Sequence, residues 1–78
     1  MEPRKRWSKR LSKTWTIEVN ASSRTGWLCG DTICIYFAVY ASGRVKYGIP
    51  GVIPQYVKDQ VIDCCLEAAG DLGVELDI

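Results

Sequence analysis

Residues 32–49, TICIYFAVYASGRVKYGI, constrain the fold of this 78-residue chain more than any other segment. Two runs rich in β-branched and aromatic residues flank a short polar stretch, which is the pattern of a β-hairpin. A three-residue loop at 41–43 would place Gly43 in the left-handed conformation that such hairpins need. A two-residue loop would instead turn Arg44 and Lys46 toward the apolar face, so the three-residue register is favoured.

The hairpin register predicts two contrasting faces. One face is apolar or aromatic and consists of Ile35, Phe37, Val39, Val45, Tyr47 and Ile49. The other consists of Tyr36, Ala38, Tyr40, Arg44 and Lys46. The first face requires a hydrophobic cover, whereas the second can remain in solvent or bind a partner.

Two further segments have a regular hydrophobic pattern. Residues 14–21 alternate between apolar and polar side chains, which predicts a half-buried strand, and residues 27–31 predict an irregular connection to the hairpin. Residues 54–69 have an apolar arc that exceeds half of the helical circumference, which predicts a helix with a proline tolerated in its first turn. We expect the glycines at positions 70 and 73 to end this helix.

These patterns predict an α+β fold, with a three-stranded antiparallel β-meander packed against one C-terminal α-helix. Residues 74–78 alternate again and could add a short fourth strand. We expect a single domain at 14–78, preceded by a basic N-terminal arm at 1–13. Because the apolar arc is wider than one sheet contact needs, a homodimer, or the arm docked through Trp7 and Leu11, would cover the excess.

Charge is divided unevenly along the chain. Residues 1–13 carry six bases and one acid, whereas residues 14–78 carry four bases and eight acids. We expect the arm to be disordered, or helical only when it is docked. Its basic and aromatic side chains are candidate contacts to nucleic acid, and they are Arg4, Lys5, Arg6, Trp7, Lys9, Arg10 and Lys13.

The predicted helix carries an acidic ridge, a series of acids at four-residue intervals that consists of Asp59, Asp63, Glu67 and Asp71. Like charges at this spacing destabilise a helix by about 0.2–0.5 kcal/mol per pair. A solvated face would usually mix bases with the acids. The ridge could therefore bind a cationic groove built for nucleic acid, or receive the basic arm of its own chain or of a second copy. It could also be simply solvated.

The four cysteines and the absence of histidine limit metal chemistry. Cys29 and Cys34 are separated by four residues, whereas Cys64 and Cys65 are adjacent and would point about 100° apart on a helix. Such positions do not readily surround one zinc ion. We favour four buried thiols in a reducing compartment over a metal or disulfide role, and we expect no cofactor.

The sequence lacks the patterns that are typical of enzymes. It has no histidine to act as a general base, no serine or cysteine in a glycine elbow, and no phosphate-binding loop. It also lacks an apolar stretch of about 18 residues and an apolar segment behind its charged N-terminus. We therefore expect a non-enzymatic, cytoplasmic protein that does not bind membranes.

In its length, its meander-plus-helix layout and the acidic stretch DQVIDCCLEAAGD, the chain resembles the small α+β inhibitors of phages and other mobile elements, anti-CRISPR proteins among them. The resemblance implies an inhibitor or regulator of a host protein or nucleoprotein complex. The acidic ridge would imitate phosphates at a nucleic-acid-binding surface of that partner. Further partner contacts would come from the outer sheet face, through Tyr36, Tyr40, Arg44 and Lys46.

Two other functions fit the sequence. The basic arm and the Tyr/Arg sheet face could bind nucleic acid directly, with Tyr36 and Tyr40 stacked on bases. The chain could also be a structural subunit of a larger complex.

Overall fold

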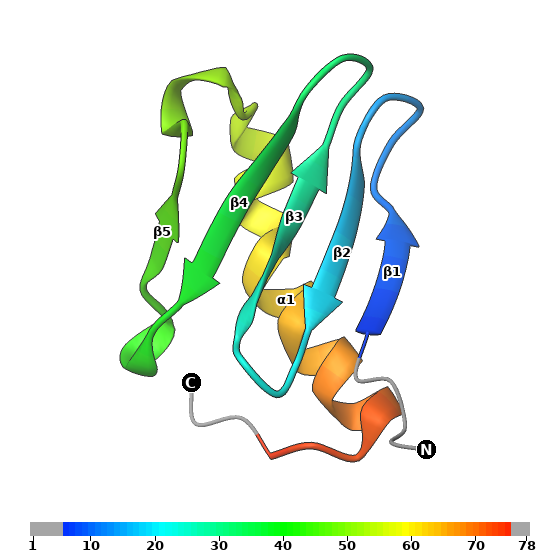
Figure 1. Cartoon of the computed structure of the whole chain (residues 1–78), viewed down its shortest axis with the longest axis vertical. Coiled ribbons are helices and arrows are strands. Elements are labelled where there is room, and N and C mark those ends of the chain that lie inside the picture. Colours follow the sequence, from blue (N-terminus) through cyan, green and yellow to red (C-terminus); the bar gives the residue numbers. More distant parts are fainter. Residues whose placement is uncertain (1–5, 76–78) are drawn as a thin grey trace.

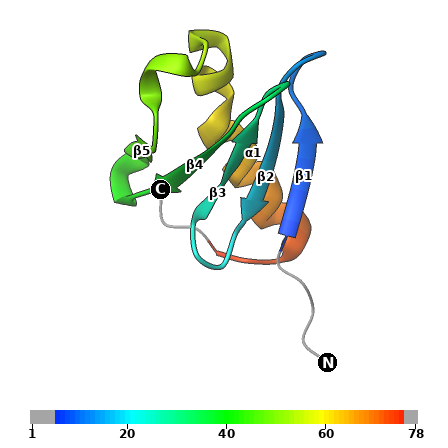
Figure 2. The same ribbon diagram turned by 45° about the horizontal axis from the view of Figure 1, so that its top comes forward.

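The computed structural model describes residues 6–75, in which five antiparallel strands form one sheet and one helix packs against it (Figure 1). The strands lie side by side in chain order. The helix lies on one face of the sheet (Figure 2). The predicted α+β class is therefore confirmed, although the sheet has five strands and not three or four. The elements are β1 (Arg6–Arg10), β2 (Thr16–Asn20), β3 (Thr25–Cys29), β4 (Cys34–Val39), β5 (Val45–Tyr47) and α1 (Gln55–Leu72).

Strands β4 and β5 form the predicted hairpin in the predicted register. Gly43 has a φ of 80°, the left-handed conformation that the loop requires. Ser42 also has a positive φ, 69°, which the sequence did not indicate. Ile49 is half exposed, in contrast to the prediction, because β5 ends before it. The paired residues are Phe37 with Tyr47, Ala38 with Lys46, and Val39 with Val45.

Residues 6–10 form the edge strand β1, so the prediction of a disordered or helical arm is wrong for this segment. The strand pairs with β2 along its whole length. Trp7 faces the helix and packs with Leu11 against the margin of the core, whereas Arg6 and Arg10 point to the opposite face. Charged side chains on a short edge strand also discourage pairing with other chains.

Residues 25–29 form strand β3, where the sequence predicts an irregular connection from residue 27 onward. Gly26 makes this strand hard to predict from the sequence, because it occupies an inward position at which an apolar side chain would be expected. The ring of Phe37 takes that space. A Cβ atom at Gly26 would lie 2.6 Å from Phe37 Cζ and would also collide with the carbonyl oxygen of Glu18. Close packing of this ring against the backbone therefore requires glycine.

Helix α1 continues one turn beyond its predicted end. The exposed Gly70 lies within the helix, where it costs roughly 1 kcal/mol relative to alanine. The helix ends at Gly73, whose φ of 68° is left-handed. The N–H of Gly73 donates to the Gly70 carbonyl at 3.4 Å, and the N–H of Val74 donates to the Ala69 carbonyl at 2.9 Å. These two bonds form a Schellman motif, which makes Gly73 the stop signal.

The last strand predicted for residues 74–78 falls mainly on residues 76–78, which lie outside the described part of the chain. Residues 74 and 75 belong to no strand.

The hydrophobic core lies between α1 and the inward face of the sheet. Ile62 covers its margin, and Leu66 is 48% exposed. Much of the wide apolar arc is thus covered within one copy of the chain, and the homodimer stays a prediction. The buried core consists of Trp15, Ile17, Val19, Leu28, Ile35, Phe37, Val39, Ile53, Val57, Val61, Cys64, Cys65 and Ala68.

Candidate functional site

The sheet face opposite α1 has no covering element among residues 6–75, and we call it the open face. Figure 1 looks onto this face, with α1 behind the sheet. Because side chains alternate along a strand, the open face carries every second residue of each strand. These residues are Arg6, Ser8 and Arg10 of β1, Thr16, Glu18 and Asn20 of β2, Thr25, Trp27 and Cys29 of β3, Cys34, Tyr36 and Ala38 of β4, and Lys46 of β5.

Exposed aromatic side chains occupy the middle of the open face. Trp27 and Tyr36 are register partners, and their rings meet edge to face with centroids 5.5 Å apart. Tyr40 follows on the same side of the chain, and the guanidinium of Arg44 lies 5.7 Å from its ring centroid. Each of these three aromatic residues is 45% exposed. A cluster of exposed aromatic groups is typical of a binding surface.

Cations flank the aromatic centre on both sides. Arg6 and Arg10 lie on β1 at one edge of the sheet, and Lys46 and Arg44 lie on or next to β5 at the other. All four are exposed. Glu18 is the one carboxylate among the strand residues of the open face. The predicted basic arm and the predicted Tyr/Arg face thus contribute to a single surface.

The other residues predicted to act in the basic arm lie elsewhere. Trp7 and Lys9 are on the helix side of β1, and Lys13 is exposed in the turn between β1 and β2. Arg4 and Lys5 lie outside the described residues. Of the five candidates that the structure describes, Arg6 and Arg10 therefore reach the open face.

The acidic ridge lies on α1, on the other side of the molecule from the open face. A helix turns about 100° per residue, so acids four residues apart drift by about 40° around its axis. This drift brings the last two acids to β1. The Nζ atom of Lys9 lies 3.1 Å from Glu67 Oε2, and Trp7 Nε1 donates to Asp71 Oδ2 at 2.8 Å. Part of the ridge therefore binds the chain's own basic segment.

The first two acids of the ridge are exposed to solvent. Asp59 accepts a hydrogen bond from the Gln55 amide one turn earlier, at 2.9 Å. Asp63 forms no ion pair with any residue between 6 and 75. All four acids of the ridge are exposed, but Asp59 and Asp63 form no ion pair or hydrogen bond with β1, so they are the part of the ridge most available to a partner.

The shifted ionisable groups belong to the helix side of the sheet. The hydrogen bond and the negative charge of Glu67 raise the pKa of Lys9. Burial raises the pKa of the Cys64 thiol and raises the pKa of Cys65 to about 11. Burial likewise raises the pKa of Tyr47. Both thiols are therefore protonated and poor nucleophiles at neutral pH.

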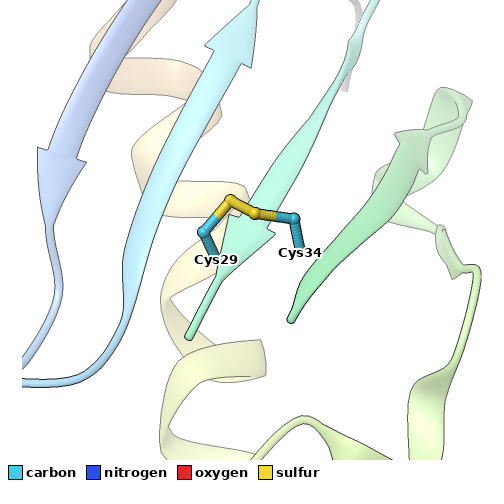
Figure 3. Close-up of a disulfide and its surroundings, with 2 residues drawn as sticks. All are labelled: Cys29 and Cys34. Atoms are coloured by element: carbon cyan, nitrogen blue, oxygen red, sulfur yellow. A yellow bond between two sulfur atoms is a disulfide. The ribbon is translucent and has the colours of Figure 1, made fainter. Parts of the chain in front are cut away.

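Cys29 and Cys34 form a disulfide on the open face, between β3 and β4 (Figure 3). The expectation of four buried thiols is therefore wrong for this pair, because the unpredicted strand β3 places Cys29 directly opposite Cys34. It is confirmed for Cys64 and Cys65, which are buried and free. Because disulfides persist mainly in oxidising compartments, the bond does not favour the predicted cytoplasmic localisation.

Residues 6–75 contain no group of three or more His, Cys, Asp or Glu side chains that could hold a metal ion. No helix in this range has the length and apolar character needed to cross a bilayer.

The sequence did not identify Trp27 or the disulfide as parts of this face, because both depend on strand β3. The residue pattern T-G-W-L-C offered one signal, an outward tryptophan next to an inward leucine. Comparison of the chain with protein-family models, curated proteins and solved structures gave no match.

Proposed function

We propose that the open face binds single-stranded nucleic acid. One observation carries the proposal: exposed aromatic rings lie at the centre of this face, cations lie at both of its edges, and the acids of α1 lie on the opposite side of the molecule. This arrangement combines stacking groups and phosphate contacts on one surface.

The aromatic rings, the cations and the distant acids each favour the binding of single-stranded nucleic acid to the open face. Exposed rings such as Trp27 and Tyr36 can stack on bases of any sequence, which contributes about 1–3 kcal/mol per base. The four cations can pair with phosphates. The acids of α1 would repel a polyanion, so the charge distribution favours approach to the open face. A duplex keeps its bases stacked inside, where the rings of a flat sheet cannot reach them.

Fluorescence polarisation with a labelled oligothymidylate tests the proposal. We expect Trp27→Ala to weaken binding by about 5- to 150-fold, the loss of one stacking contact. Tyr56→Ala is the matched control, because Tyr56 is an equally exposed aromatic residue (50%) that lies on α1. It should leave the affinity unchanged. Equal affinities for all three proteins would contradict stacking on the open face.

The salt dependence of binding tests the phosphate contacts separately. Each phosphate neutralised on a single strand contributes a slope of about −0.7 in the plot of log affinity against log salt. We expect Arg10→Ala to make the slope less negative by about that amount. Lys58→Ala removes a cation from α1 and should leave the slope unchanged. A protein that binds no oligonucleotide at low salt, or equal slopes for the two variants, would contradict the proposal.

A second candidate is the role that the resemblance implies, an inhibitor or regulator that binds a host protein or nucleoprotein complex through the acidic ridge. Asp59 and Asp63 support it, because both are exposed and lie on the helix surface near Leu66. Affinity capture in the presence of nuclease, with wild type and an Asp59→Lys/Asp63→Lys variant, distinguishes the two functions. Capture of a protein by wild type alone favours the ridge, and capture that depends on Arg10 and on intact nucleic acid favours the open face.

A further inference from the structure

Strand β4 carries a notch on the open face, between Tyr36 and Tyr40. These tyrosines are four residues apart on the same side of the chain, so their Cα atoms are separated by about 13 Å. Ala38 lies between them and contributes only a methyl group. Directly after β5, Gly48 has no side chain, and its N–H donates to the Tyr36 carbonyl at 2.8 Å. Lys46, opposite Ala38 in register, stands at the rim.

The notch has the dimensions of a site for a small flat ring. Its volume is about 240 Å³, and its lining includes Tyr36, Ala38, Tyr40, Lys46 and Gly48. A cavity of about 150 Å³ is enough to hold benzene. The notch is therefore large enough for a nucleobase, which has one or two fused rings.

Both walls of the notch are braced by a neighbouring side chain. The Trp27 ring meets Tyr36 edge to face, and the Arg44 guanidinium lies against the Tyr40 ring. Bracing reduces the freedom that each tyrosine would lose when a ligand binds. The two tyrosine rings are thus held in place before a ligand binds.

We infer that this notch receives one unpaired base of the bound strand, with Lys46 pairing with its phosphate and Ala38 keeping the floor open. This inference rests on the proposed function and identifies the place of one nucleotide within it. A base must leave its stack to enter the notch, which makes the site selective for single strands over duplexes.

The inference is tested by filling the notch without changing its charge or its tyrosines. Ala38→Leu places a larger side chain on the floor, and Thr32→Leu adds the same side chain to the exposed turn between β3 and β4 as the control. We expect Ala38→Leu to bind tetrathymidylate about 5- to 150-fold more weakly than wild type, and Thr32→Leu to bind as wild type does. Gly48→Leu fills the notch from the residue that follows β5 and serves as a second variant, since a Cβ there lies 3.5 Å from the Tyr36 carbonyl oxygen, an ordinary contact.

Ligands with one abasic position, placed at each site of the tetramer in turn, identify the inserted base. Wild type should lose affinity for such a ligand, whereas Ala38→Leu and Gly48→Leu should be indifferent to the abasic position. If wild type binds the tetramer and both filled variants bind it equally well, the notch inference is overturned while the proposed function stands. If wild type binds no oligonucleotide even at low salt, the proposed function fails and the inference fails with it.

Discussion

Lys9 on β1 and Glu67 on α1 are joined by an ion pair, with 3.1 Å between Nζ and Oε2. Next to it, the indole N–H of Trp7 donates to Asp71. These contacts link the helix to the edge strand that carries Arg6 and Arg10. The last two acids of the ridge therefore help to hold β1 in the sheet, although the ridge is not part of the open face.

We expect Glu67→Lys to loosen β1, because it replaces attraction to Lys9 with repulsion. The measurement is hydrogen exchange of the β1 amides, which should become faster while the β3 and β4 amides stay protected. The melting temperature should change little, because both side chains are about half exposed and surface pairs contribute little. Asp63→Lys makes the same charge change one turn earlier and should leave β1 unaffected. Equal exchange in both variants would mean that the pair does not hold the strand.

The Gly26 position predicts a sharp steric effect. Gly26→Ala should lower the free energy of unfolding by about 1–3 kcal/mol, because its Cβ would overlap Phe37 and the Glu18 carbonyl. Gly51→Ala is the control, since a Cβ at that exposed position meets nothing within 4 Å. Urea denaturation compares the two variants with wild type. Similar midpoints for both would show that Phe37 does not pack over Gly26.

The cysteines predict a distinct thiol count. Under non-reducing conditions the native protein should react slowly with a thiol reagent, and the unfolded protein should expose two thiols, those of Cys64 and Cys65. Reduction before unfolding should raise the count to four. Four reactive thiols without reduction would contradict the bond between Cys29 and Cys34.

Burial of Cys65 also predicts a pH dependence. Its pKa is raised from 9.0 to about 11, so the folded state holds the thiol proton more tightly than the unfolded state. The resulting stabilisation is complete below pH 9 and is lost as the pH rises toward 11. The fall in the urea midpoint over this range should be shallower in Cys65→Ala than in wild type. Parallel curves would mean that Cys65 ionises as readily in the folded protein as in the unfolded one.

The elements that the sequence predicted correctly are those whose hydrophobic pattern along the chain agrees with their packing in the folded structure. The β4–β5 register followed from Gly43 and from strict alternation, and the helix followed from its apolar arc. Strand β1 was missed because its outward residues are all polar or charged and one inward residue is Lys9, which pairs with the distant Glu67. Strand β3 was missed because its inward residue, Gly26, has no side chain, and the Phe37 ring of β4 fills the space instead.

The residues of the candidate site were predicted as two separate groups. The cations of the N-terminal segment and the tyrosines of the hairpin were each identified, but alternation alone cannot show that separate strands share one face. That relationship depends on β2 and β3, which lie between them in the sheet. The disulfide was missed for the same reason, since the spacing of Cys29 and Cys34 becomes a register pair only when β3 is present.

Nuclear magnetic resonance offers the most direct test of the central claim, because the chain has three tryptophans in three environments. Trp27 lies on the open face, Trp7 faces the helix and Trp15 is buried in the core. When the ¹⁵N-labelled full chain is titrated with oligothymidylate, we predict that the indole N–H signal of Trp27 moves and that the signals of Trp7 and Trp15 stay in place. Shifts confined to α1, a moving Trp7 signal with a fixed Trp27 signal, or no shift at all would contradict nucleic-acid binding on the open face.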